Sequence, residues 1–455
     1  MFDRYFDLSA RHTTFSREVK AGIATFLTLS YILFVQPAVL SGRFFGIETG
    51  MDFGALLTGT CLAAAFGTFL MALYARLPIS QAPGMGENFF FTTSLLPAAA
   101  AVGLVSGVNG WQIALGAVFF SSLIFLALSL LGVASRMVQA LSPSMRDGLV
   151  VGIGLFITLI GLENSGLIEK SQASGLSLTS HFTTPATLVF FTGLFTGVAL
   201  HARKVSSYIL WAIIGSFLMA TLLHFIVPAK MTFQLPTEIV SLPPSIAPLW
   251  FKLDLAHAFS IEMIPLILIL LVLSLFDATG TLIAVTKEAG LVREEKIPRA
   301  KAALVSNSLA AMAGSFVGMS TITSFMESLA GVEQGGRTGV TSLTVGFLFL
   351  LSLFFYPLIA MVANYPPITA PALVLVGTIM LKRVKEIDWT DYTETLPSVL
   401  IAVCIPFFFS IANGIGMGLA AYPVVKILTG RFKDLNVFNI FLGLFFLLYF
   451  LFLVR

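Results

Sequence analysis

The chain has 455 residues, of which 57% are hydrophobic and 11% are charged, and its mean hydropathy is +0.94. A soluble domain carries about 25% charged residues, whereas many apolar runs here reach the ~20 residues that cross a hydrocarbon core. A net charge of +3 is too small to indicate a nucleic-acid-binding surface. The composition therefore predicts a polytopic membrane protein that partners the lipid bilayer.

Motifs for enzymatic chemistry are absent from the sequence. Its two cysteines, Cys61 and Cys404, lie far apart inside apolar runs, so neither a disulfide framework nor a metal motif is indicated. No Walker motif is present, and no helix carries a His–Glu–His zinc pattern or a nucleophile–base pair. We therefore expect no enzyme, no cofactor, no bound metal and no direct use of ATP.

The first 20 residues are polar and lead directly into a full-length apolar segment. A stretch of this kind is not a cleavable signal peptide. Because it contains Arg4, Arg11, Arg17 and Lys20, the positive-inside rule predicts a cytoplasmic N-terminus.

Apolar runs predict seven segments before a long loop at 228–261 and seven after it. The first set is 20–41, 52–75, a short one at 80–97, 110–134, 146–166, 183–202 and 207–227. The second set is 262–286, 300–318, a short one at 321–333, 338–363, 368–382, 396–413 and 415–430, and a further apolar helix at 436–454 closes the chain. If the closing helix also spans, the C-terminus lies outside. Because seven spans precede the long loop, the eighth span runs from outside to inside, and the most basic loop, 287–301, falls inside.

An odd number of spans in each half makes the two halves inverted repeats, an arrangement that many secondary transporters use. The repeats are 1–227 and 262–455, and the third span of each is short and broken by small or polar residues. Each broken segment carries an acid, Glu87 or Glu327. Broken helices expose free N–H groups at mid-bilayer, which is tolerated where they line a cavity. The pattern favours a midplane site over two kinked helices without a ligand.

A third acid, Asp277, lies in the middle of the apolar run Leu273–Val285. A charge at that depth costs from about 2.5 to well over 10 kcal/mol, so such a residue normally faces a cavity or a partner. The alternative is an acid that only holds neighbouring helices together. Two further acids at similar depth favour a functional site.

Four motifs together point to a family: Glu18–Tyr31, Ala82–Gly86, Phe276–Leu282, and Ser315–Gly339 with Glu327 inside it. The chain closely resembles, nearly end to end, the purine-permease branch of the nucleobase–ascorbate transporters. The resemblance implies an all-α membrane fold of about fourteen helices in two inverted seven-helix repeats. It also implies a substrate-carrying core from 20–134 and 262–363 and a gate from 146–227 and 368–455, with the broken third and tenth spans meeting at a midplane site.

The resemblance assigns a substrate triad to Asn88, Asp277 and Glu327, with backbone N–H groups near Phe89 and Met326 meeting the base. The chemistry agrees, because a purine edge alternates donors and acceptors, a carboxylate accepts, and an amide does both. The aromatic residues Phe89 and Phe325 are suited to pack against the flat base, although core packing is the alternative for each. Thr281, one turn after Asp277, stands where uracil-type relatives carry a histidine, and it is also assigned to the substrate site.

The resemblance implies import of purine nucleobases (adenine, guanine or hypoxanthine) across the cell membrane by proton symport with alternating access. Desolvation favours the neutral form of a buried acid, so Glu327, Asp277 and Glu87 are candidate proton carriers. Glu87 departs from the family, which usually has an apolar residue there. The preferred purine stays open, sodium is not excluded as the coupling ion, and a homodimer through the gate is compatible with the family.

Rival functions differ in what they require. An anion transporter or exchanger on the same fold, of the sulfate type, is the main alternative, but acids facing the site would repel its substrate. A channel is a further alternative, which mirrored broken helices alone do not exclude.

Arg337, at the cytoplasmic end of the tenth span, either caps that helix or is an ordinary positive-inside residue.

Overall fold

The computed structural model describes residues 2–132, 141–171, 175–180, 182–236, 238–292 and 297–452. Within these ranges, eleven helices are long and apolar enough to cross a membrane. The shorter helices α14 (Ala300–Phe316) and α19 (Tyr392–Phe408), with the broken segment from β4 (Ile322–Ser324) to α15 (Ser328–Glu333), supply the remaining predicted spans. The predicted class, a polytopic helical membrane protein with inverted repeats, is confirmed.

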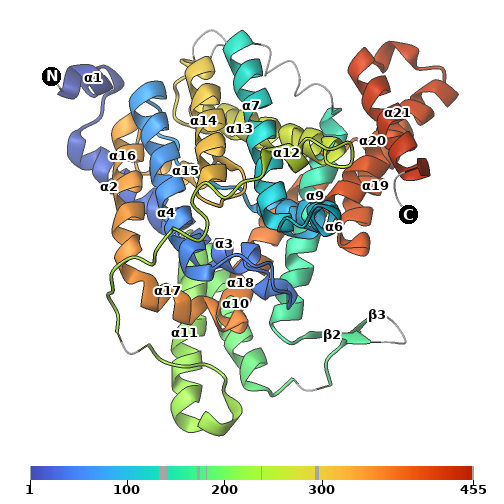
Figure 1. The fold of residues 1–455 in the computed structure, drawn as a ribbon. Helices are drawn as coiled ribbons and strands as arrows, with labels where there is room; N and C mark the ends of the chain where they lie inside the picture. Colours follow the sequence, from blue (N-terminus) through green and yellow to red (C-terminus); the bar gives the residue numbers. More distant parts are fainter. Residues whose placement is uncertain are drawn as a thin grey trace.

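The elements of the first half alternate between long helices and short helical turns (Figure 1). In order they are α1 (Phe2–Phe6), η1 (Ser9–Arg11), α2 (Phe15–Leu29), α3 (Ile32–Leu40), η2 (Arg43–Phe45), α4 (Phe53–Leu70), η3 (Met71–Ala75), β1 (Gln81–Pro83), α5 (Met85–Phe90), η4 (Phe91–Leu95), α6 (Leu96–Ser106), α7 (Gly110–Leu131), α9 (Pro143–Asn164), β2 (Ile168–Ser171), β3 (Gly175–Leu178), α10 (Pro185–Ala202) and α11 (Tyr208–Ile226).

The second half follows the long loop, which itself contains two short helices, and then repeats the pattern. Its elements are η6 (Pro228–Lys230), α12 (Leu255–Ala258), α13 (Ile264–Glu288), α14, β4, α15, α16 (Gly339–Ser352), η7 (Leu353–Phe355), α17 (Tyr356–Ala363), α18 (Pro366–Leu381), η8 (Lys382–Glu386), α19, α20 (Ile411–Leu428), η9 (Phe432–Asp434) and α21 (Val437–Phe452).

Several predicted span boundaries were wrong. The third span does not end at 97, because α5, η4 and α6 run on to Ser106. The predicted spans 396–413 and 415–430 each begin and end earlier in the structure. Asp391 caps α19 at the backbone N–H of Thr393, and Ser410 caps α20 at that of Asn413, so polar caps set the helix starts.

Parts of other predictions fall outside the described residues. These are the end of the fourth predicted span at 133–134, residues 293–296 of the basic loop, and the end of the closing helix at 453–454.

The helices pack into two groups. The first group comprises α2–α7 and α13–α17, in which α16 contacts α2 and α4, and α14 contacts α4 and α7. The second group comprises α9–α11 and α18–α21, in which α9 contacts α18 and α19, and α20 contacts α21. Figure 1 shows α2, α4 and α16 on the left and α19, α20 and α21 on the right. Each group draws helices from both halves of the chain.

A buried carboxylate joins the two halves within the first group. Glu18 of α2 accepts hydrogen bonds from the backbone N–H of Arg337 (2.8 Å) and of Thr338 (3.2 Å) and from the hydroxyl of Thr341 (2.6 Å). These donors belong to the first turn of α16 and the residues before it, so Glu18 acts as a helix cap supplied from a distant segment. Arg337 donates to the carbonyl of Val332 at 2.6 Å, which confirms that it caps α15.

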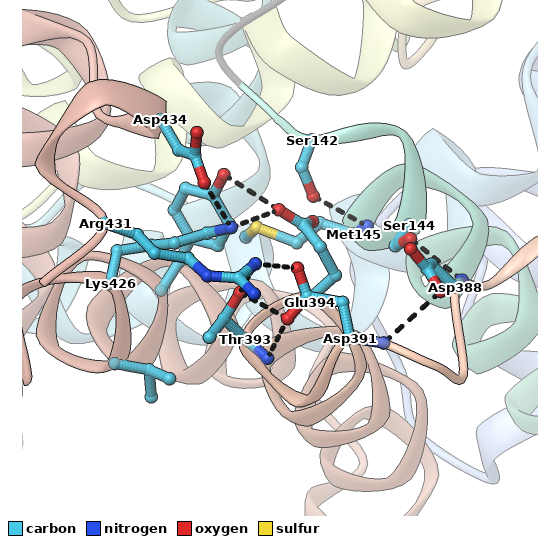
Figure 2. Close-up of polar contacts among 12 residues, drawn as sticks. Ser142, Ser144, Met145, Asp388, Asp391, Thr393, Glu394, Lys426, Arg431 and Asp434 are labelled. Carbon is cyan, nitrogen blue, oxygen red and sulfur yellow. Dashed lines mark hydrogen bonds and ion pairs between the residues drawn. The ribbon is translucent and has the colours of Figure 1, made fainter. Parts of the chain in front are cut away.

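A charge cluster holds the linker between α20 and α21 against α19 (Figure 2). The buried ammonium of Lys426 lies 2.8 Å from a carboxylate oxygen of Glu394 and 3.1 Å from one of Asp434. Beside it, Arg431 pairs with Asp391. The carboxylates of Glu394 and Asp434 compensate the charge of Lys426, so its ammonium can be buried at this end of the second group.

Candidate functional site

Two three-residue strands form the centre of the site. β1 and β4 pair antiparallel, with Gln81 opposite Ser324, Ala82 opposite Thr323, and Pro83 opposite Ile322. Each strand leads into a short helix, α5 or α15. The predicted broken segments therefore meet as inverted repeats require, and they meet through backbone hydrogen bonds rather than through side chains alone.

Side chains of neighbouring helices hold the two strands in place. The hydroxyl of Thr68 on α4 donates to the carbonyl of Gln81 at 2.9 Å, and its oxygen accepts from the N–H of Gln81 at 3.0 Å. On the other strand, the hydroxyl of Ser324 and the amide of Asn307 on α14 exchange hydrogen bonds of 3.1 and 3.2 Å. Because these partners are buried, the crossing of the strands is a rigid platform.

Glu327 lies at the start of α15, just after β4. Its Oε1 accepts a hydrogen bond of 2.9 Å from the hydroxyl of Tyr31, which stands at the start of α3. Tyr31 is buried, and Glu327 is half-buried. One carboxylate oxygen is thereby oriented, and Glu327 keeps acceptor capacity for a second donor. Tyr208 of α11, in the second helix group, also interacts electrostatically with Glu327.

Asn88 lies on α5 and is fully buried, with 0% of its surface exposed. Its side-chain oxygen accepts a hydrogen bond from the hydroxyl of Ser320, which precedes β4. Its amide nitrogen donates to the carbonyl of Pro83 over 3.5 Å, a long bond. These two contacts hold the Asn88 amide between β1 and the residue that precedes β4.

Asp277 lies near the middle of α13, which contacts β4, α5 and α15. Its carboxyl group is adjacent to that of Glu87 on α5 and also interacts with Glu327. The structure thus brings the three acids predicted from sequence together around the β1–β4 pair.

The remaining predicted residues differ in their surroundings. The ring of Phe89 is fully buried and packs edge-to-face against Phe45 at 5.8 Å and Phe156 at 5.9 Å, between ring centroids. Phe325 and Thr281 are also buried, whereas Met326 is 40% exposed. Core packing is thus the surrounding observed for Phe89, and its predicted contact with a base stays a prediction, as do the roles of Phe325, Met326 and Thr281.

Sequence reasoning missed three residues at the site, Tyr31, Tyr208 and Ser320. Tyr31 donates a hydrogen bond to the predicted acid Glu327, Ser320 donates one to the predicted amide Asn88, and Tyr208 interacts electrostatically with Glu327. A signal existed for Tyr31, because it ends the motif Glu18–Tyr31 and interrupts the first apolar segment, which α2 and α3 share. Ser320 likewise lies inside the motif Ser315–Gly339, whereas no sequence pattern singles out Tyr208.

The two helix groups touch next to the site. Phe89 contacts Phe156 of α9, and Phe156 contacts Phe409 at 5.7 Å between ring centroids. The hydroxyls of Ser94 on η4 and Ser410 before α20 are 3.2 Å apart. A cavity of about 310 Å³ lies at this contact, lined by Thr93, Ser94, Leu266, Phe408, Phe409 and Asn413.

Chemically, the site combines acceptor groups with few donors. Carboxyl groups accept N–H donors of a neutral, hydrogen-bonding ligand, and the backbone N–H groups at the strand ends supply donors. Among the described residues, no cluster of His, Cys, Asp and Glu is arranged to hold a metal ion. Such a site fits a small polar molecule.

Comparison with known proteins agrees with this geometry. A family model described as a permease family matches residues 16–417. The adenine permease AdeP of Escherichia coli is 38% identical over 452 residues, which cover 98% of this chain and 95% of that protein. The guanine/hypoxanthine permease PbuG of Bacillus subtilis is 37% identical over 457 residues, covering 99% of both chains. The chain belongs to the nucleobase–ascorbate transporter family.

Solved structures extend the comparison to the fold of this transporter family. The transmembrane domain of a cyanobacterial bicarbonate transporter, BicA, superposes with a TM-score of 0.59 over 88% of this chain and 97% of that domain. At 16% identity the likeness shows the shared inverted-repeat fold alone. As a member of the nucleobase–ascorbate family, the chain is a multi-pass membrane transporter.

Proposed function

We propose that the chain imports purine nucleobases, adenine or guanine and hypoxanthine, by proton symport with alternating access. Relatives named as adenine and guanine/hypoxanthine permeases, which align over nearly the whole chain, support the substrate class. One of these relatives is named for adenine and the other for guanine and hypoxanthine, so uptake assays decide which base this chain prefers.

The observation that carries the proposal is the meeting of Asn88, Asp277 and Glu327 around the β1–β4 pair. A neutral purine offers N–H donors to the two carboxyl groups and ring acceptors to amide and backbone N–H groups. The exposed Met326 and half-buried Glu327 lie on the segment that would meet the base. Buried acids near the bilayer midplane also supply the groups that a proton symporter needs.

Alternating access requires two bodies that move relative to one another. The first helix group corresponds to the expected core and the second to the expected gate. The two groups contact each other between α2 and α11, between α17 and α18, and between α20 and both α5 and α13, as well as at Phe89–Phe156 and Ser94–Ser410. In this proposal these are the surfaces that move past one another during a transport cycle. In this proposal the core carries the base past the gate, the N-terminus is cytoplasmic, and the protein lies in the cell membrane.

The alternative is an anion transporter, as the shared fold with a bicarbonate transporter illustrates. Three carboxyl groups at the site oppose it, because they repel an anion. No Lys, Arg or His of the described residues forms an ion pair with any of the three. A neutral purine meets no such repulsion.

The test is uptake by the full chain in proteoliposomes with an imposed proton gradient. Labelled adenine, guanine, hypoxanthine, xanthine and uracil are compared, with and without a protonophore, and bicarbonate and sulfate are offered as competitors. We expect uptake of a 6-substituted purine, little uptake of uracil or xanthine, and loss of accumulation with the protonophore. Preferred uptake of uracil, or competition by an anion, would contradict the assignment.

A further inference from the structure

Glu87 is a buried acid whose carboxyl oxygens accept no hydrogen bond of normal geometry. Only 1% of its surface is exposed, and neither carboxyl oxygen has a partner among the described residues. The side chain occupies space that Gly84 leaves open, since a Cβ on Gly84 would lie 2.8 Å from the carboxyl carbon of Glu87. The missing side chain at Gly84 thus provides the space for this carboxyl group in the interior, where its oxygens have no hydrogen-bond partner among the described residues.

The group next to Glu87 is another carboxyl group, that of Asp277. Two carboxylates cannot donate a hydrogen bond to each other, and like charges in a low-dielectric interior repel strongly. If one of them holds a proton, the same pair gains a strong O–H···O hydrogen bond and only one charge remains. Protonation of the pair thus supplies the donor that the oxygens of Glu87 lack.

The ionisable side chains that surround the Glu87–Asp277 pair are acids and tyrosines. The ionisable groups around it are Glu87 on α5, Asp277 on α13 and Glu327 before α15, with Tyr31 and Tyr208 acting on Glu327 from α3 and α11. Within the described residues, none of the three acids forms an ion pair with a Lys, Arg or His. A proton is then the compensating charge that the site can take from water.

We propose that Glu87 and Asp277 share one proton, and that this proton is the one transported together with the base. The assignment rests on the function proposed above. In the outward-open state hydronium gives its proton to one of the two carboxylates, and an O–H bond forms. In the inward-open state that O–H bond breaks, the proton passes to water as hydronium, and both groups of the pair are left as carboxylates.

Glu327 has a different task under this assignment. Its Oε1 already accepts from Tyr31, and its half-buried position leaves acceptor capacity open toward the ligand. The two functions of a symporter are thus divided between neighbouring acids: Glu327 binds the base, and the Glu87–Asp277 pair carries the proton. Because Asp277 also interacts with Glu327, charge on the pair influences how well the base binds.

The experiment measures purine and proton entry together. The full chain, E87Q and E327Q are reconstituted in liposomes that contain a pH-sensitive dye, and labelled adenine and hypoxanthine are supplied from about pH 5 to pH 8. For E87Q we expect the protons entering per purine to fall about tenfold or more, and purine uptake to lose its dependence on pH. For E327Q we expect purine affinity itself to fall about tenfold. The exposed Glu48 provides a matched control, and E48Q should resemble the unaltered protein.

Each outcome bears on one of the two proposals. If the unaltered protein moves no purine, the proposed function fails. If it co-transports purine and protons but E87Q keeps the same ratio and pH profile, only the shared proton is refuted. Purine uptake that follows a sodium gradient without proton entry also overturns it. If E87Q does not fold, infrared spectra of the unaltered protein decide, since a shared proton requires the C=O band of a buried, protonated acid, and its absence overturns the inference.

Discussion

The hydroxyl of Tyr31 donates a 2.9 Å hydrogen bond to Oε1 of Glu327, and this bond joins the two inverted repeats at the site. Tyr31 begins α3 in the first repeat, whereas Glu327 begins α15 in the second. The contact orients an acid on a segment that is otherwise short and partly exposed. The position of Glu327, a predicted substrate ligand, therefore depends on Tyr31, which lies at the break between α2 and α3.

Removal of this hydroxyl tests its importance for binding. In Y31F the ring remains but the hydroxyl donor is lost, so the carboxylate of Glu327 loses the hydrogen bond that orients it. A hydrogen bond to a charged group contributes about 1.5–3 kcal/mol, and we expect purine affinity to fall about tenfold or more. The measurement is competition binding of unlabelled against labelled purine in the purified protein. Y392F, at a position 80% exposed, is the control, and unchanged affinity in Y31F would remove Tyr31 from the site.

Glu327 itself is tested by the isosteric change E327Q. The amide keeps the shape, but it replaces an acceptor-only carboxylate with a group that also donates, and it cannot take part in charge-assisted binding. We expect transport to fall about tenfold or more while the protein still reaches the membrane. Uptake assays paired with quantification of the protein in membranes would show this. Near-normal uptake would mean that Glu327 is not the main ligand.

Several features of the fold were predictable because they depend on local chemistry. Long apolar runs and an odd number of spans per half led to the inverted repeats, and the small residues before Glu87 and around Glu327 led to the broken segments. The acid Asp277 stood out because charge inside an apolar run is costly. These signals are each contained in one stretch of sequence.

Features that depend on distant contacts were not predictable. Three-residue strands such as β1, which ends in Pro83, have too little pattern to indicate a sheet, and each forms only because the other is present. The ring of Phe89 was predicted to meet a base, but its contacts with Phe45 and Phe156 come from segments far apart in sequence. The bond between Tyr31 and Glu327 has the same origin.

The cap that Glu18 provides for α16 predicts a loss of stability when its carboxylate is removed. In E18A the backbone N–H groups of Arg337 and Thr338 lose their acceptor, and each unsatisfied buried donor costs about 1–3 kcal/mol. We expect a lower unfolding temperature for E18A, and a smaller decrease for E18Q, which keeps one acceptor oxygen. Thermal unfolding in detergent measures both variants. Equal unfolding temperatures for E18A and the unaltered protein would show that water replaces the cap without cost.

The charge cluster around Lys426 leads to a prediction about the second helix group. In K426M the ammonium is replaced by an apolar side chain of similar length, and Glu394 and Asp434 lose their shared cation. Removal of one partner from a buried ion pair costs about 3–5 kcal/mol, so we expect a clear decrease in unfolding temperature. The double variant K426M/E394Q should recover part of the loss, because the more buried of the two uncompensated charges is then neutral. K385M is the matched control, since the side chain of Lys385 is 77% exposed. The same unfolding temperature for K426M and K385M would mean that the linker between α20 and α21 is held by apolar packing instead.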